Sequence, residues 1–131
     1  MPDWLIEIVS VTPTEPGGPT AAFKPATQDV LVGDNITWTN RTDVSHQPVP
    51  LNPKPLAWPA SFGVDPVPPD QSCNPTYSVV APVQLDSNGQ PVIDPNTKKT
   101  IPVYGAVTYQ CKDHPNEVGT FNILKVPPTF S

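Results

Sequence analysis

The 131-residue chain carries seven basic and twelve acidic side chains, which gives a formal net charge of −5. This balance argues against a nucleic-acid partner, because binding phosphates requires a basic surface. The acidic surface either keeps the protein soluble or suits a basic protein partner. The length predicts one domain, residues 1–131, around a single core, and no apolar run is long enough to cross a membrane.

Proline is the most unusual feature of the composition, with 21 residues, well above the roughly 5% that proteins use on average. Segments rich in valine, isoleucine, threonine and aromatic residues lie between the prolines, so the chain is not of the disordered class. Because proline is rare inside central strands, the prolines mark where strands end. The composition therefore predicts a β protein with many loops.

The first part of the chain predicts three strands. Residues 5–11 are largely apolar and end at a run of prolines and glycines, and residues 30–32 form a short apolar segment. After a turn at residues 33–34, Ile36 and Trp38 alternate with polar residues. This period of two is typical of a strand with one face in the core.

The middle of the chain predicts loops and a hairpin. Residues 48–75 hold nine prolines in 28 positions, so we expect an ordered excursion over the surface without regular structure. Residues 76–85 read as a strand. Turn signals then recur within residues 85–100, including an Asn-Gly pair, and predict a small hairpin insertion there.

The end of the chain predicts two more strands, residues 103–111 and residues 121–126. Alternation in the first of these places Cys111 on the same face as Val107 and Tyr109, so its sulfur should point into the core. No segment shows the helical period. Short strands at this spacing predict an all-β fold, an antiparallel Greek-key β-sandwich.

Three side chains suggest a metal site. Cys111 and His114 lie in the run Tyr-Gln-Cys-Lys-Asp-His-Pro at residues 109–115, and His46 is the only other histidine. One thiolate with two imidazoles suits copper, because thiolate favours Cu(I) and imidazole also binds Cu(II). The residues alone leave three alternatives open: part of a zinc site, a buried structural cysteine beside a solvated histidine, and a disulfide between Cys73 and Cys111.

Two segments resemble the cupredoxin family, the small blue copper proteins such as plastocyanin and amicyanin. Residues 23–40, followed by His46, are similar to the central strands of that family. The Tyr-x-Cys-x-x-His-Pro run at residues 109–115, with the closing strand at residues 119–123, is similar to its ligand loop. Both segments occur in the family's order.

The resemblance implies a cupredoxin-like sandwich that holds one copper per chain and transfers single electrons. We expect no enzymatic activity, because the sequence shows no second metal cluster, no catalytic arrangement beyond the ligands and no phosphate loop. It implies His46, Cys111 and His114 as the ligands, with the ring edge of His114 reaching the surface as the route for electrons. Cys73 would then be a free thiol with no assigned role. The other functions to weigh are copper storage, delivery or sensing, and a metal-free interaction domain with a Cys73–Cys111 disulfide.

The axial position departs from the family, because many cupredoxins place a methionine after the loop histidine and the only methionine here is Met1. With the short amicyanin-like loop, Glu117 takes that position, and a slightly longer loop would place Val118 there as a non-ligating residue. A glutamate oxygen would favour Cu(II), whereas valine would leave copper with three ligands. Glu117 could also point into solvent, as most glutamates do.

Polar residues around the proposed ligands could orient them from outside, as is common in metal sites. The candidates are Asn40 and Gln47, on either side of the first histidine, and Asp113, next to the second. Thr42, Asp43 and Ser45 lie in the same stretch, and all of these could equally be ordinary loop residues.

The resemblance also implies a setting outside the cytoplasm, in the periplasm, at the cell surface or secreted. The first residues lack the basic, apolar and small-residue regions of a signal peptide, so we expect an export signal or an anchor to have been removed. The implied partners are redox proteins, and the acidic balance of the chain suits partners with basic surfaces.

Overall fold

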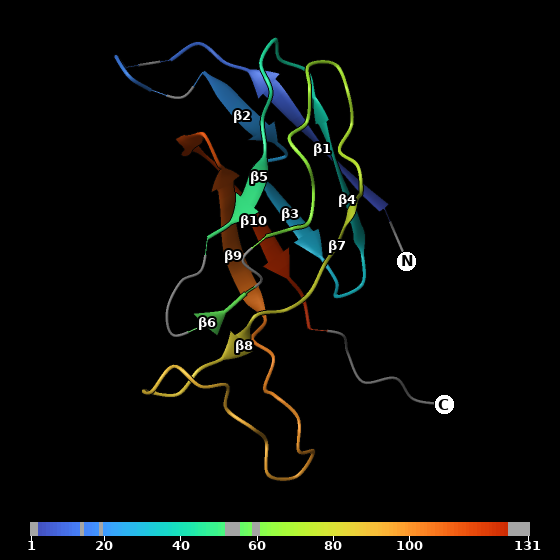
Figure 1. The fold of residues 1–131 in the computed structure, drawn as a ribbon, viewed down its shortest axis with the longest axis vertical. Helices are drawn as coiled ribbons and strands as arrows, with labels where there is room; N and C mark the ends of the chain where they lie inside the picture. Colours follow the sequence, from blue (N-terminus) through green and yellow to red (C-terminus); the bar gives the residue numbers. More distant parts are fainter. Residues whose placement is uncertain (1–2, 14, 19, 52–55, 59–60, 126–131) are drawn as a thin grey trace.

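The computed structural model describes residues 3–13, 15–18, 20–51, 56–58 and 61–125. Within these residues, ten strands form two facing four-stranded sheets and a small two-stranded ribbon (Figure 1). The first sheet has the order β2 (Ala21–Lys24), β1 (Asp3–Ser10), β4 (Asn35–Asn40), β7 (Tyr77–Ser78). The second has the order β3 (Thr27–Val30), β10 (His114–Ile123), β9 (Gly105–Cys111), β5 (Pro48–Pro50), and the ribbon pairs β6 (Leu56–Ala57) with β8 (Val83–Gln84).

The predicted all-β sandwich is confirmed, but its strands are not all antiparallel. β1 runs parallel to β4, and β3 runs parallel to β10, so both sheets are mixed. The reason is that β3 lies in the sheet opposite β1 and β2, and the chain then returns to place β4 beside β1. Alternation of side chains shows that a strand has a buried face, but it carries no information on the direction of the neighbouring strand.

Proline decides several strand boundaries. The expected strand at residues 76–85 is divided into β7 and β8, with Pro82 directly before β8. The proline-rich stretch at residues 48–75 is less irregular than expected, because it contains β5 and β6. β5 includes Pro48 and Pro50, and it lies at the edge of its sheet, where a missing backbone donor is tolerated.

The last strand, expected at residues 121–126, begins earlier than predicted, because β10 runs from His114 to Ile123. Val126 lies outside the described residues. The hairpin expected within residues 85–100 is present as isolated bridges, Leu85 with Pro91 and Ile93 with Thr100. None of the described segments forms a helix of the length and apolarity that crossing a membrane requires.

Aromatic side chains fill the space between the sheets. Trp38 from β4, Tyr109 from β9 and Phe121 from β10 are fully buried. The rings of Tyr109 and Phe121 stack with centroids 4.8 Å apart, and Trp38 meets Tyr109 edge-on at 5.5 Å. Removing a side chain such as Phe121 from water contributes about 1.5 to 3 kcal/mol, so this cluster ties β4 firmly to β9 and β10.

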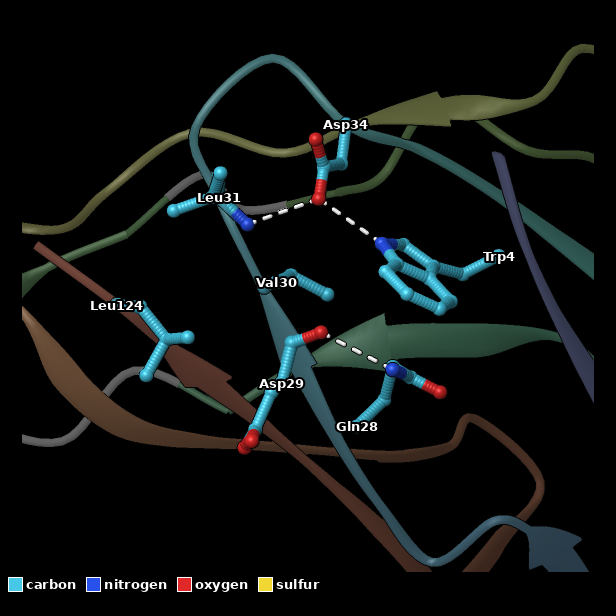
Figure 2. Close-up of a pocket in the computed structure, with 7 residues that line it drawn as sticks. All are labelled: Trp4, Gln28, Asp29, Val30, Leu31, Asp34 and Leu124. Atoms are coloured by element: carbon cyan, nitrogen blue, oxygen red, sulfur yellow. Dashed lines mark hydrogen bonds between the residues drawn. The ribbon is translucent and has the colours of Figure 1, made fainter. Parts of the chain in front are cut away.

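A surface pocket of about 410 Å³ lies where β4 begins and β10 ends (Figure 2). At this end Asp34 is almost fully buried, and its Oδ2 accepts hydrogen bonds from Trp4 Nε1 at 2.8 Å and from the Leu31 amide at 2.9 Å. These bonds join the start of β1 to the turn before β4. The pocket is lined by Trp4, Gln28, Asp29, Val30, Leu31, Asp34 and Leu124.

Gly119 is required by close packing against Tyr109. A Cβ atom at this position would lie 2.3 Å from Cζ and 2.4 Å from the hydroxyl oxygen of Tyr109. Tyr109 is fully buried and cannot move aside easily.

We predict that Gly119→Ala lowers the free energy of unfolding by about 1 to 3 kcal/mol, the usual effect of overpacking a core. Denaturant titration measures this, with Val118→Ala on the exposed face as the control, and equal stability of the two variants would contradict the prediction.

Candidate metal centre

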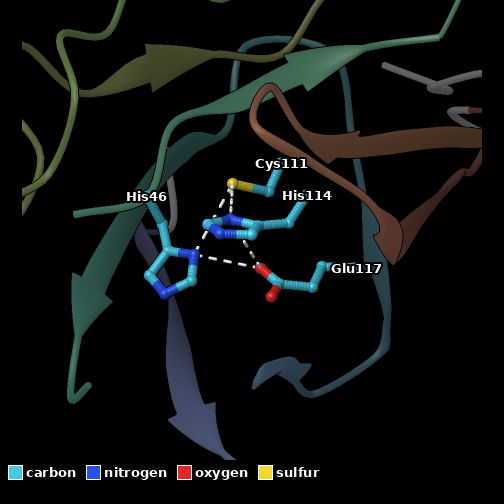
Figure 3. A group of neighbouring side chains, drawn as sticks. All are labelled: His46, Cys111, His114 and Glu117. Atoms are coloured by element: carbon cyan, nitrogen blue, oxygen red, sulfur yellow. Dashed lines mark hydrogen bonds and ion pairs between the residues drawn. The ribbon is translucent and has the colours of Figure 1, made fainter. Parts of the chain in front are cut away.

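Four side chains with metal-binding atoms converge at the end of the sandwich where β4 and β9 finish and β10 begins (Figure 3). They are His46, Cys111, His114 and Glu117, and their donor atoms all lie within 4.8 Å of one another. Within the described ranges, no other group of three or more His, Cys, Asp or Glu side chains has this geometry.

Backbone pairing positions the first two of these residues. His46 follows the end of β4 and pairs with Val67, donating to its carbonyl at 3.2 Å and accepting from its amide at 2.7 Å. Cys111 is the last residue of β9, and it faces inward with Val107 and Tyr109, as the alternation predicted. A bond from the Lys112 amide to the Gln47 carbonyl, at 2.8 Å, ties the two ligand segments together.

A bulge at the start of β10 brings Glu117 inward. His114 pairs with Cys111 and Val118 pairs with Gln110, so adjacent residues on β9 face residues four apart on β10. Residues 115–117 are therefore inserted between two paired positions. Bulges change the direction in which side chains point, and Glu117 is only 2% exposed whereas Val118 is 44% exposed.

The structure thus decides between the placements that the sequence left open for these two residues. The interpretation that Glu117 points into solvent is wrong, and it is Glu117 rather than Val118 that lies beside the histidines and the cysteine. Loop length alone could not separate the two positions, because the bulge that orients them depends on how β9 and β10 pair.

The donor atoms are in close contact. Oε1 of Glu117 lies 3.0 Å from Nδ1 of His46 and 3.6 Å from Nδ1 of His114. Sγ of Cys111 lies 3.2 Å from Nδ1 of His114 and 3.5 Å from Nδ1 of His46. Lone pairs at such distances repel one another unless protons or a cation lie between them.

Burial shifts the pKa values of His46 and Cys111. Removal from water lowers the pKa of His46, an effect that Glu117 opposes and His114 reinforces. His46 is therefore neutral at neutral pH and can offer a lone pair. Burial likewise raises the pKa of the Cys111 thiol, while backbone N–H groups of Gln47, Asp113 and His114 act in the opposite direction by stabilising the thiolate.

The residues expected to orient the ligands act in different ways. Gln47 and Asp113 contribute their backbone amides to the Cys111 sulfur, while the Gln47 side chain bonds the Val64 carbonyl and the Asp113 side chain is exposed. Asn40 is fully buried and is linked through Thr42 to the ring of His46. The only sequence signal for Thr42 was its position four residues before a histidine.

The donor set fits a metal ion. Oε1 of Glu117 is buried, and its only polar contacts among the described residues are with the histidine Nδ1 atoms, which can themselves be bare. A buried carboxylate oxygen is costly unless it has a hydrogen-bonding or positively charged partner. A cation among the four donor atoms would supply that partner. A sulfur, two imidazole nitrogens and a carboxylate oxygen are all ligands that transition metals accept.

Cys73 lies away from this cluster. Both cysteines are free and buried, and Sγ of Cys73 accepts a hydrogen bond from the Trp38 amide at 3.3 Å. Burial raises the pKa of its thiol. The alternative of a Cys73–Cys111 disulfide is therefore not what the fold contains, and Cys73 has a packing role beside β4.

Comparison with solved structures supports the fold. A reduced amicyanin with a tryptophan-to-tyrosine substitution matches with a TM-score of 0.54 and 15% identity, over 93% of this chain and 82% of that chain. A reduced amicyanin with a proline-to-phenylalanine substitution matches with a TM-score of 0.51 and 18% identity, over 92% and 80% of the two chains. No family model and no curated protein matches the sequence. The resemblance to cupredoxins is thus confirmed for the fold, here without a methionine at the donor cluster.

We predict that Cys73 and Cys111 remain unlinked in the purified protein, because each sulfur is occupied by its own neighbours in separate parts of the fold. Both thiols should react with a thiol reagent after unfolding without reductant, and Cys73→Ser should leave one. Mass spectrometry of a non-reduced digest provides the check. A peptide containing both cysteines joined by a disulfide would contradict this prediction and the metal centre with it.

Proposed function

We propose that this chain is a mononuclear copper protein that transfers single electrons. One copper ion would be held by His46, Cys111 and His114, with Glu117 as a fourth ligand. The observation that carries the proposal is the convergence of these four donor atoms within 4.8 Å at the buried end of a cupredoxin-like sandwich. Copper would supply a one-electron couple, because the donor set combines ligands suited to each oxidation state.

Rigidity of the surroundings favours electron transfer over catalysis. Cys111 and Glu117 come from strands, and His46 is held by its pairing with Val67. A site that cannot rearrange changes little between oxidation states, which suits the exchange of electrons. We accordingly propose no enzymatic activity.

His114 is the proposed route for electrons. Its side chain is 36% exposed, whereas the side chains of His46 and Glu117 are 1% and 2% exposed. A partner protein would therefore reach the site through the ring of His114. The net charge of −5 favours redox partners with basic surfaces, and the cupredoxin-like fold suggests a location outside the cytoplasm.

Glu117 favours a second candidate function, copper storage, delivery or sensing. A carboxylate is a hard ligand that stabilises Cu(II) over Cu(I), so it slows exchange between the two states while it strengthens retention of the oxidised ion. The burial of this carboxylate beside both Nδ1 atoms is the specific observation behind this alternative.

We predict that Cys111→Ser abolishes the coloured Cu(II) form, because an intense thiolate-to-copper absorption requires the sulfur. The wild-type protein should take up one copper per chain and show this band together with a matching EPR signal. Cys73→Ser is the matched control, since it removes the other thiol and should leave the spectrum unchanged. Equal colour in wild type and Cys111→Ser would rule out the proposed ligand set.

We predict that Glu117→Met raises the reduction potential, because a hard oxygen that favours Cu(II) is replaced by a soft thioether that favours Cu(I). The rise should be about 59 mV for each tenfold change in the relative affinity for the two ions, the value for a one-electron couple. Voltammetry measures the potential, and the spectrum should move towards that of an ordinary blue copper site.

Glu117→Gln is the control for this prediction, because it keeps an oxygen and removes only the charge, so it should change the potential less. If all three proteins had the same potential, ligation by Glu117 would be excluded. A storage or sensing role would instead be favoured by tight retention of Cu(II) together with slow electron exchange in the wild-type protein.

A further inference from the structure

The two ring nitrogens of His46 face different neighbours. Nδ1 faces Oε1 of Glu117 at 3.0 Å and Sγ of Cys111 at 3.5 Å, while Nε2 lies 3.0 Å from the hydroxyl oxygen of Thr42. His46 is 1% exposed and Thr42 is 6% exposed, so water does not compete at either nitrogen. A neutral imidazole carries one ring proton, so one nitrogen donates and the other keeps its lone pair.

The other contacts of the Thr42 hydroxyl favour its accepting a hydrogen bond from His46. It lies 2.7 Å from Oδ1 of Asn40 and 2.9 Å from the backbone oxygen of Val44, and both of these atoms are acceptors without a proton. The single hydroxyl proton is therefore directed to one of them. With its proton on one of these acceptors, the hydroxyl presents a lone pair to Nε2, and this arrangement favours the ring form with the proton on Nε2 and a bare Nδ1.

The amide of Asn40 is itself fixed by backbone groups. Its Nδ2 donates to the carbonyls of Val44 at 2.6 Å and Val67 at 2.9 Å, and its Oδ1 accepts from the Thr42 amide at 2.9 Å. A flipped side chain would place oxygen against two carbonyl oxygens and NH₂ against an N–H group. The orientation therefore follows from partners whose roles cannot change.

We propose that Thr42 is a positioning residue that holds the proton of His46 on Nε2 and so keeps Nδ1 ready for a metal ion, a role that rests on the proposed function. Glu117 is the competitor, since its carboxylate lies beside Nδ1 and would attract the ring proton there. Without the Thr42 hydroxyl, the proton moves to Nδ1, and a metal then has to displace it before His46 can bind. The relay from Asn40 through Thr42 thus prepares the ligand before metal arrives.

The first test needs no metal. Long-range ¹H–¹⁵N NMR of the metal-free protein at neutral pH distinguishes the two neutral ring forms, and the chain has only two histidines. Wild type and Thr42→Ser, which keeps the hydroxyl, should show His46 protonated on Nε2. Thr42→Val, which keeps the shape and removes the hydroxyl, should shift the ring towards protonation on Nδ1. A wild-type ring protonated on Nδ1 overturns the assignment, even if the valine variant does not fold.

The second test measures Cu(II) affinity by competition with a chelator. Thr42→Val should weaken binding by about 10- to 100-fold, the usual effect of removing a group that orients a metal ligand, and Thr42→Ser should stay close to wild type. Equal affinity of Thr42→Val and wild type, with both folded by circular dichroism, would overturn the positioning role. A wild-type protein that takes up no copper would overturn the proposed function, whereas the ring form in the metal-free protein would still decide what Thr42 does to His46.

Discussion

Burial of the Glu117 carboxylate is the constraint on which the rest of this structure depends. Its oxygen lies among a sulfur and two imidazole nitrogens at one end of the sandwich, and its polar contacts among the described residues are with the histidine Nδ1 atoms. Burying a carboxyl group is unfavourable unless hydrogen-bond donors or a positive charge compensate it. The fold therefore has to hold four ligand side chains close together, and each neighbouring element contributes to that task.

The aromatic core supplies the rigidity. Tyr109 lies two residues before Cys111 on the same face of β9, and it packs against Trp38 on the strand that leads to His46. The same ring occupies the space that a side chain at position 119 would need, just beyond the bulge that turns Glu117 inward. Core packing and site geometry are therefore coupled through Tyr109, so a substitution in the core also shifts the positions of the donor atoms.

The sequence allowed the sandwich to be predicted, together with the three residues His46, Cys111 and His114 that the fold brings together, because alternation and a short motif are local properties. It did not reveal the parallel pairs β1–β4 and β3–β10, since strand direction depends on which sheet each segment joins. It also left Glu117 and Val118 unresolved, because the bulge depends on pairing across β9 and β10. Thr42 could not be ranked above its neighbours, since its role comes from a contact with His46 that only the folded loop creates.

Under the proposed function, the free energy of unfolding depends on metal binding. The unfolded chain does not hold all four donors, which span residues 46 to 117, at one point, so a metal ion binds the folded state more tightly than the unfolded chain. Such a ligand stabilises folding by an amount that grows with its concentration, about 4.1 kcal/mol when it is present at a thousand times its dissociation constant. That gain is comparable with the total stability of many domains, roughly 5 to 15 kcal/mol. A carboxylate that is unfavourable without a cation can thus be retained, because the ion that it binds offsets the free energy that its burial costs.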